Sequence, residues 1–561
     1  MSPHRRKDTT HAMADESDKS RAALRGETVP AELDSDLTIR CVIRGIRYND
    51  GYATELRDKC TIPSITRALN ARAIMSNRIP HIANDDEMPY CFWHPDVPNE
   101  QTLRQLLQRY PESAVLRYGA GRACAVAGYA SLYRELDLLP EVSIAEEARD
   151  GGTTGGKEIF DVIMSQPTRY AVMDDYRRAL HDPPVPDACL NGDMCTRSAL
   201  ECKQIFPDPQ DSRAVLRPPR FDITEDWGID TTGTRFESKA VSHETLTLLH
   251  KPLPRDLPAV DKDLLILLAA WSGNIDRYVR LRRPTMISGE RQCVVRGIYH
   301  DSLFARWCYE ELDSSFRKYA YARFVMNGDL SWLTDDVADD DLPDLIWHPD
   351  VADGHVYEEL ARRRPTMKAS CAHACIVGNA PGPFVRIDPP PVASAWVEAD
   401  ACLNREFAQL FERKATLLGT SLGDLLRIQD ESTESESRDE RYWDTFLVVE
   451  NGGPIRPQLC SKVTLENIGF MPPEGADDAP TKNIRSIFAY DTMAPRVQVP
   501  AGYELLDLTE VYRDAPFVEA EVRPLLGLYP NPRRPEGGYR RRGGSRGRGC
   551  PGREAIEKPR L

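Results

Sequence analysis

The stretch LLILLAAWSGNIDRYVRL, residues 264–281, decides the fold class of this chain. Its apolar residues recur at helical spacing on both sides of a Gly273–Asn274 pair. Glycine and asparagine accept the left-handed backbone that ends a helix, so the pair predicts a turn between two helices. The small residues Ala269 and Ala270 would let two helices approach closely. The stretch therefore predicts a helix–turn–helix hairpin and a mainly α-helical fold.

The chain around this hairpin is duplicated. WHPDV occurs at residues 93–97 and again at 347–351, and CVIRGI at 41–46 matches CVVRGI at 293–298. Between these strings, ARAIMSN at 71–77 matches ARFVMNGD at 322–329. Internal repetition in the same order is typical of proteins built from stacked supersecondary units. We therefore expect two helical-repeat blocks, copy one over about 38–138 and copy two over about 261–381.

Turn-forming residues mark a shorter period within each copy. In copy one these residues are Gly45, Asn77 and Gly128, which are 32 and then 51 residues apart. In copy two they are Gly297, Gly328 and Asn379, which are 31 and then 51 residues apart. We expect a break between helices at each of them.

This pattern resembles the ankyrin repeat, whose period is about 33 residues and whose sequence runs roughly LHLAA..GH.E.V..LL. The CVIRGI, ARFVMN and LARRRP blocks are also similar to a poorly characterised group of ankyrin-like proteins of filamentous fungi. The resemblance implies a solenoid of ankyrin-like helical units and implies no chemistry. Since the TPLH tetrapeptide of standard ankyrin repeats is missing, an unclassified helical solenoid is the alternative.

The segments outside the two copies differ in composition. Residues 1–37 are polar and are expected to be disordered. Residues 139–260 predict a helix over 157–180 with a break at Pro167, followed by a Pro-rich irregular linker. Residues 382–529 predict a helix over 402–418 and a small β-containing element, with strand-like runs such as TFLVVE at 445–450. Residues 530–561 predict a disordered Arg/Gly-rich tail.

Charge is spread unevenly along the 561 residues, whose net charge is −15. Residues 530–561 hold nine Arg and one Lys against three Glu, or +7, so the other 529 residues carry −22. No run approaches the ~18 apolar residues of a membrane span, and no apolar stretch follows the basic N-terminus as in a secretion signal. We therefore expect an intracellular protein of the nucleus or cytoplasm, whose 14 cysteines are thiols rather than disulfides.

The tail is the segment whose residue types point most directly to a function, which is binding of nucleic acid or of a partner. GGYRRRGGSRGRG at 537–549 combines flexible glycines with arginines, which bind phosphate, and a tyrosine, which can stack on a base. Such segments resemble RNA-binding tails and nuclear-import signals. A solubilising tail that contacts the acidic body, or nothing specific, is the alternative. The candidate nucleic-acid or partner contacts are Tyr539, Arg540, Arg541, Arg542, Arg546 and Arg548.

Two motifs carry residue types that bind ligands, but each fits a structural role better. GGTTGGKE, residues 151–158, matches a phosphate loop as far as Lys157, but Glu158 stands where a hydroxyl is needed. CAHAC, residues 371–375, places two cysteines on one helical face, but no second ligand pair lies at a zinc spacing. We expect a glycine-rich surface loop and buried thiols, and neither a metal nor a cofactor.

Two further motifs carry His and Asp. No nucleophile motif accompanies the His–Asp pairs of WHPDV, His94 with Asp96 and His348 with Asp350. We expect the Trp to fill the core, His–Pro to stop a helix and the Asp to cap the next helix. DDVADDDLPD, residues 335–344, lacks the Gly and Glu of a calcium loop and predicts a solvated acidic loop able to dock a basic partner.

These patterns predict a non-enzymatic, ankyrin-like protein-interaction scaffold, since repeat solenoids bind partners on extended surfaces. By analogy of fold, its most specific form is a nuclear regulatory adaptor or a transcription coregulator. We expect a protein partner and no membrane. One alternative is an RNA-binding protein acting through its tail, and another is an enzyme with a dispersed, motif-less active site.

Overall fold

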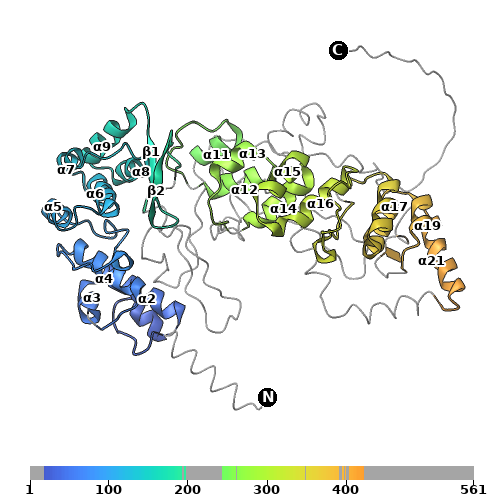
Figure 1. Cartoon of the computed structure of the whole chain (residues 1–561), viewed down its shortest axis with the longest axis horizontal. Coiled ribbons are helices and arrows are strands. Elements are labelled where there is room, and N and C mark those ends of the chain that lie inside the picture. The colour runs from blue at the N-terminus through green and yellow to red at the C-terminus, as the bar shows by residue number, and fades with distance from the viewer. Residues whose placement is uncertain are drawn as a thin grey trace, which may run out of the picture.

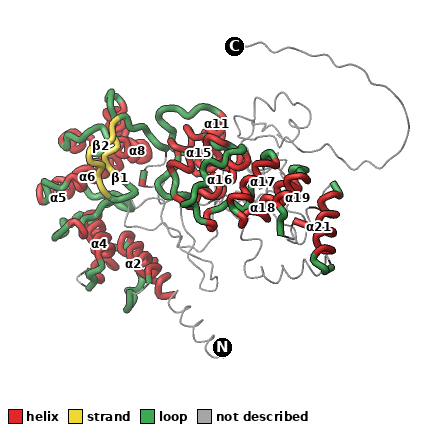
Figure 2. Tube along the Cα trace, turned by 45° about the vertical axis from the view of Figure 1, so that its right-hand side comes forward, coloured by secondary structure: helices red, strands yellow, loops and turns green. Residues whose placement is uncertain are grey.

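The structure is a computed structural model, and it describes residues 18–33, 35–57, 59–192, 195–196, 243–260, 262–287, 289–347, 349–390, 395–396, 399 and 404–421. Within these residues the chain is mainly helical, with a single two-stranded antiparallel sheet (Figure 2). The expected mainly α-helical class is confirmed. None of the helices in these ranges is long and apolar enough to cross a membrane. The helices follow one another in chain order from one end of the molecule to the other (Figure 1).

Copy one is built from short helices, and the longest connection between them carries the WHPDV segment. They are α2 (Asp36–Tyr48), α3 (Asp50–Leu56), α4 (Pro63–Met75), the 3-10 turn η1 (Asp85–Glu87), α5 (Glu100–Arg109), α6 (Ala114–Ala127) and α7 (Ala130–Glu135). Two further helices follow, α8 (Val142–Gly151) and α9 (Thr154–Met164). Their apolar faces form a cluster over α2–α4 and a second one from α4 to residue 190.

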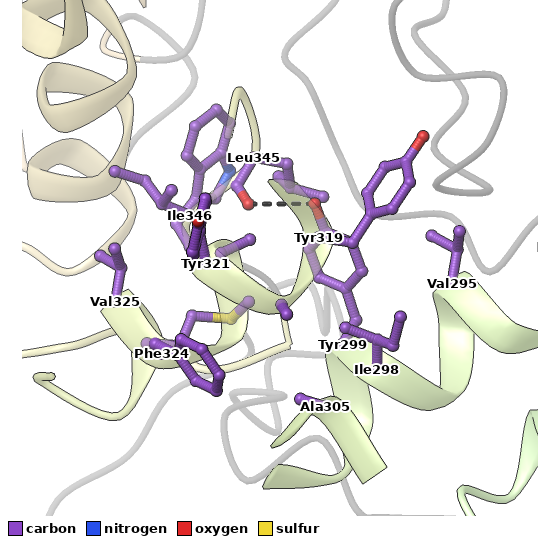
Figure 3. Packing of buried hydrophobic residues seen from close by; sticks show 14 of the residues in the cluster. Val295, Ile298, Tyr299, Ala305, Tyr319, Tyr321, Phe324, Val325, Leu345 and Ile346 are labelled. Carbon is purple, nitrogen blue, oxygen red and sulfur yellow. Dashed lines mark hydrogen bonds between the residues drawn. The ribbon is translucent and has the colours of Figure 1, made fainter. Parts of the chain in front are cut away.

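Copy two repeats this order. It contains α12 (Asp263–Trp271), α13 (Ile275–Leu281), α14 (Glu290–His300), α15 (Ser302–Glu311), η2 (Ser314–Phe316), α16 (Arg317–Met326), η3 (Asp339–Asp341), α17 (Gly354–Arg363), η4 (Pro365–Met367), α18 (Lys368–Val377) and α19 (Pro381–Ile387). α11 (His243–His250) precedes it and α21 (Glu406–Leu417) follows it. Its core is rich in aromatic residues, and Tyr299 and Tyr319 pack there between α14 and α16 (Figure 3).

The predicted hairpin of residues 264–281 is confirmed. α12 ends before Gly273, whose φ of 65° is the left-handed value that glycine tolerates. Asn274 then caps α13 by accepting a hydrogen bond from the Arg277 backbone N–H. The helix predicted over 402–418 also forms, as α21.

The N-terminal segment differs from the disorder expected over residues 1–37. Residues 18–24 are helical, and Ala23 and Leu24 are buried against α2–α4. The reason is visible in AALRG at 22–26, which has the same pattern as AAWSG at 269–273. Gly26 and Gly273 both adopt a positive φ, 68° and 65°. A short helix rich in small residues thus begins the first repeat in the same way as the second.

Two of the six expected breaks do not occur. Asn77, Gly128, Gly328 and Asn379 have positive φ and end helices as predicted. Gly45 and Gly297, by contrast, lie inside α2 and α14. A Cβ atom on Gly45 would lie 2.2 Å from the Ala23 carbonyl oxygen, and one on Gly297 would lie 2.1 Å from the Ala270 carbonyl oxygen. Glycine is therefore used at these two positions for close helix packing rather than for a turn.

The region after copy one contains a β-hairpin where we expected the end of a helix and an irregular linker. The helix expected over 157–180 ends at Met164, and the chain then forms β1 (Tyr170–Asp174), which pairs with β2 (Ala179–Pro186). Val172 and Met173 are buried and the other residues of β1 are partly buried, and the β-branched and aromatic residues of this run favour a strand. Most of the expected linker, residues 197–242, and the strand-like runs beyond 421 lie outside the described residues.

Candidate interaction surface

One ion pair of copy one ties the WHPDV loop to α4. Arg72 Nη1 lies 2.6 Å from Asp96 Oδ2, and the same nitrogen donates to the backbone oxygen of Arg47 at 3.0 Å. The hydrogen bonds join the end of α2, the last turn of α4 and the loop before α5. Asp96 is therefore a partner of Arg72 and not the expected cap of the next helix, a role that Asn99 takes.

Copy two contains the same construction. Arg323 Nη1 lies 2.6 Å from Asp350 Oδ2 and donates to the backbone oxygen of Tyr299 at 3.0 Å. The cap of α17 is Asp353. Both aspartates thus bind an arginine in the same way, so the WHPDV segment has the same structural role in both copies, which is to anchor its loop to a helix.

The tryptophans of the two motifs fill the core, as expected. Trp93 is 2% exposed and Trp347 is 3% exposed. Each carries a polar side chain against its ring, since the Arg122 guanidinium lies 4.9 Å from the Trp93 ring centroid and His373 stacks on Trp347 at 5.2 Å. The expectation that His–Pro stops a helix is wrong, because the loop leading to His94 is not helical.

A buried network of charges surrounds Trp93. Arg122 lies 2.6 Å from Asp175 and 3.4 Å from Glu147, and its side chain has no exposed surface. Tyr90 donates to Asp175 at 2.8 Å and the Trp93 indole N–H donates to Glu147 at 3.0 Å. Burial raises the pKa of Glu147, and the nearby Arg122 opposes that shift. The network faces inward and joins α6, α8 and the end of β1, so it holds the fold together rather than presenting groups to a substrate.

The glycines of GGTTGGKE allow three helix ends to meet. A Cβ on Gly155 would lie 1.9 Å from the Gly128 oxygen, and a Cβ on Gly156 would lie 2.9 Å from the Ala125 oxygen. Thr153 caps α9 by accepting from the Gly156 backbone N–H. Glu158 is paired with Arg134. The segment is thus a packed junction between α6, α8 and α9 rather than the expected flexible surface loop, and its glycines are explained without a phosphate.

The cysteines of CAHAC are buried thiols, as predicted. Cys371 and Cys375 are both fully buried and free. Burial raises the pKa of Cys375 to about 12, so the thiol stays protonated at neutral pH. In the part of the chain that the structure describes, no three His, Cys, Asp or Glu side chains come together in a way that could hold a metal ion.

Exposed carboxylates occur at the same place in both copies. The turn η1 carries Asp85, Asp86 and Glu87, and η3 carries Asp339, Asp340 and Asp341. Each turn begins eight residues before the tryptophan of WHPDV, and none of the six residues is buried. The acidic loop expected over 335–344 is thus partly a 3-10 turn. We refer to these two three-residue segments as the acidic turns.

The acidic turn of copy one carries no motif of its own, but aligning the two WHPDV strings reveals it as DDEMP against DDDLP. Backbone contacts hold it in place, because Asn70 donates to the Glu87 carbonyl at 2.9 Å and Arg67 donates to the Asp86 carbonyl at 3.1 Å. The candidate contacts of the tail, residues 539–548, lie outside the described residues.

A family model described as the YKP1 C-terminal domain matches residues 93–186. The match begins at the tryptophan of the first WHPDV and ends at the last residue of β2, so it spans α5–α9 and the β-hairpin. No curated protein matches the chain, and no solved structure matches it either. This part of the chain is therefore similar to that domain.

Proposed function

We propose that this chain is a non-enzymatic, ankyrin-like scaffold that binds a protein partner through a basic segment of that partner. The observation that carries the proposal is the repetition of an exposed acidic turn at the same structural position in both copies. The helix pairs that begin each copy, each with its left-handed glycine, support an ankyrin-like arrangement of helical units. By analogy of fold, the most specific form of the function is a nuclear regulatory adaptor or transcription coregulator.

The chemistry of the other polar groups favours binding over catalysis. The WHPDV carboxylates are paired with Arg72 and Arg323, and the charges around Trp93 are buried against one another. In the acidic turns, by contrast, Asp85, Asp86, Asp340 and Asp341 are exposed to solvent. The other two carboxylates have neighbours, since Asp339 lies 3.9 Å from Arg364 and Glu87 accepts a hydrogen bond from the Ala83 backbone N–H. A single exposed ion pair contributes only about 0–1 kcal/mol, so affinity would require several carboxylates acting together. Their combined field would speed the approach of a cationic partner and would weaken with salt.

The test is affinity purification of the full-length chain followed by mass spectrometry, with two charge variants in parallel. The first variant removes the charges of both acidic turns by Asp→Asn and Glu→Gln changes. The control variant removes six other exposed charges, at Glu55, Glu112, Asp161, Asp276, Glu311 and Glu412. Both variants have the same net charge, so a difference between them reports position rather than total charge.

We expect a reproducible protein partner with the wild type and the control variant, and loss of that partner with the acidic-turn variant. Equal capture by all three chains would refute the role of the acidic turns. Failure of the wild type to retain any partner would count against the scaffold itself.

RNA binding through the tail is the second candidate. The +7 charge of residues 530–561 and the mixture of Arg, Gly and Tyr favour it. Deleting residues 530–561 should abolish the RNA that co-purifies with the full-length chain, while leaving protein partners of the acidic turns in place. Unchanged RNA retention would refute this candidate.

A further inference from the structure

Residues 251–260, KPLPRDLPAV, contact both halves of the chain at once. One half is copy two. The other is copy one with α8, α9 and the β-hairpin, which share its apolar cluster from α4 to residue 190 and are counted with copy one below. This segment was expected to belong to an irregular linker, but several of its backbone groups and the side chains of Asp256, Leu257 and Val260 make defined contacts. We refer to it as the clamp segment. Figures 1 and 2 place the β1–β2 hairpin on the side of copy one that faces α11, the helix that directly precedes this segment.

One set of contacts joins the clamp segment to copy one. The Arg169 guanidinium holds the Asp256 carboxylate with two hydrogen bonds, of 2.8 and 3.0 Å. The Leu257 backbone N–H donates to the Leu190 oxygen at 3.0 Å, and Arg149 of α8 donates to the Leu257 oxygen at 2.8 Å. A bidentate pair between arginine and a carboxylate has a defined geometry, so these contacts fix orientation as well as position.

The chain at 190–192 is itself fastened to copy one. Glu146 of α8 accepts hydrogen bonds from the backbone N–H groups of Asn191, at 2.8 Å, and Gly192, at 3.0 Å. Gly192 in turn accepts from the Val260 backbone N–H at 3.1 Å. The clamp segment is therefore connected to α8 through both a side chain and a second stretch of backbone.

A different set of contacts joins the clamp segment to copy two. Arg277 and Arg280 of α13 donate to the backbone oxygens of Lys251, at 3.0 Å, and Arg255, at 2.6 Å. The side chains of Leu257 and Val260 belong to the apolar core of copy two, and Leu257 is fully buried there. The core of copy one is a separate cluster.

We propose that the clamp segment fixes the orientation of the two copies, so that they move as one body. Leu257 carries the argument, because its backbone is bonded to copy one while its side chain is buried in the core of copy two. Rotation of one copy against the other would break the Arg169–Asp256 pair or pull Leu257 into water. A rigid junction would also hold the two acidic turns at a constant separation, a consequence that goes beyond the proposed function and does not depend on it.

The test measures the distance between the copies by single-molecule energy transfer in the full-length chain. Dyes are attached to p-azidophenylalanine placed at Val162 of α9 and at Leu303 of α15, both of which are exposed. The variant Asp256→Ala removes the bidentate pair on the side of copy one. The double variant Arg277→Ala/Arg280→Ala removes the arginine hydrogen bonds on the side of copy two, including that of Arg277 to the Leu248 oxygen of α11. Arg306→Ala, which removes an exposed i,i+4 pair with Glu310, is the control.

We expect one narrow distribution for the wild type and the control, and a broad or multiple distribution for both junction variants. Hydrogen exchange in α6 and α14 shows whether each core stays folded. If hydrogen exchange shows that Asp256→Ala loosens a core, the proposal is judged on the double variant. Arg277 and Arg280 bond the oxygens of Lys251 and Arg255 near the surface, so their removal should leave both cores folded. A narrow, unshifted distribution in a folded junction variant would overturn the proposal, and so would a broad distribution in the wild type.

Discussion

Replacing Gly297 by alanine should separate two helices that the fold requires to be in contact. A Cβ at this position would lie 2.1 Å from the Ala270 carbonyl oxygen, which is a backbone atom of α12. Its other near neighbour is the Phe304 ring, at 2.9 Å. The obstruction cannot be relieved by turning a flexible side chain, so α14 must move away from α12.

The size of the effect follows from this geometry. Opening the contact from 2.1 Å to an ordinary 3.4 Å is a shift of about 1.3 Å across a buried helix interface. Overpacking a core costs about 1–3 kcal/mol, and the upper end applies because the atom struck is backbone. Alanine is better than glycine inside a helix by about 1 kcal/mol, which offsets part of the cost. We expect a net destabilisation of about 2 kcal/mol, which corresponds to a roughly 30-fold larger open population.

Hydrogen exchange read peptide by peptide is the appropriate assay, since a chain with several blocks need not unfold in one step. The Gly297→Ala variant should raise exchange in α12 and α14 about 30-fold, and Gly45→Ala should do the same around α2, where the corresponding distance is 2.2 Å. Gly382→Ala is the matched control, because the nearest atom to its Cβ is the end of the flexible Arg386 side chain at 3.4 Å. Unchanged or slower exchange in α12 and α14 of Gly297→Ala, alongside a neutral control, would refute the close approach of these helices.

Three further predictions concern polar groups. Arg323→Ala should destabilise copy two by about 1–3 kcal/mol, because the Tyr299 carbonyl and the Asp350 carboxylate both lose their hydrogen-bond donor. Thermal unfolding measures this, and an unchanged melting temperature would refute the role of Arg323 as an anchor. Burial raises the pKa of the Cys371 thiol, so Cys371 should resist alkylation at pH 8 while the half-buried Cys60 reacts. Mass spectrometry of the alkylated chain tests this, and equal labelling of the two cysteines would contradict it. Hydrogen bonding to Arg78 lowers the pKa of Asp50 to about 2, so the pair's contribution to stability is complete above about pH 4 and is lost as the pH falls towards 2. Acid unfolding of Arg78→Ala should therefore differ from wild type at pH 5 and converge with it near pH 2, and a difference that persists at pH 2 would count against the pairing.

Periodicity and repetition were enough to predict much of the helical architecture. The hairpin at 264–281, the helix at 402–418 and four of the six turn residues lie where their local chemistry placed them. These features depend on residues close together in the chain, because the spacing of apolar residues predicts a helix and a glycine with a positive φ ends it. The β-hairpin was missed because residues 170–174 gain their strand partner only when β2 folds back onto them, and the sequence of that partner is rich in proline.

The roles of single residues were harder to predict where they depend on distant contacts. Gly45 and Gly297 look like turn residues in the sequence, but a carbonyl of another helix explains them. Asp96 and Asp350 look like helix caps, but arginines more than 20 residues earlier in the chain bind them. The acidic turn of copy one was visible in the sequence only after comparison with its counterpart in copy two.

The sequence by itself determined that this protein is mainly helical and internally duplicated, and that it carries an acidic body with a basic tail. These properties follow from residue spacing and charge, which do not require knowledge of the fold. Only the tertiary structure decided that the helix at 18–24 belongs to the first repeat, that the WHPDV aspartates are anchors, and that residues 251–260 touch both copies. The physical reason is that each of these roles depends on a partner far away in the chain, and only folding brings the two within hydrogen-bonding or packing distance.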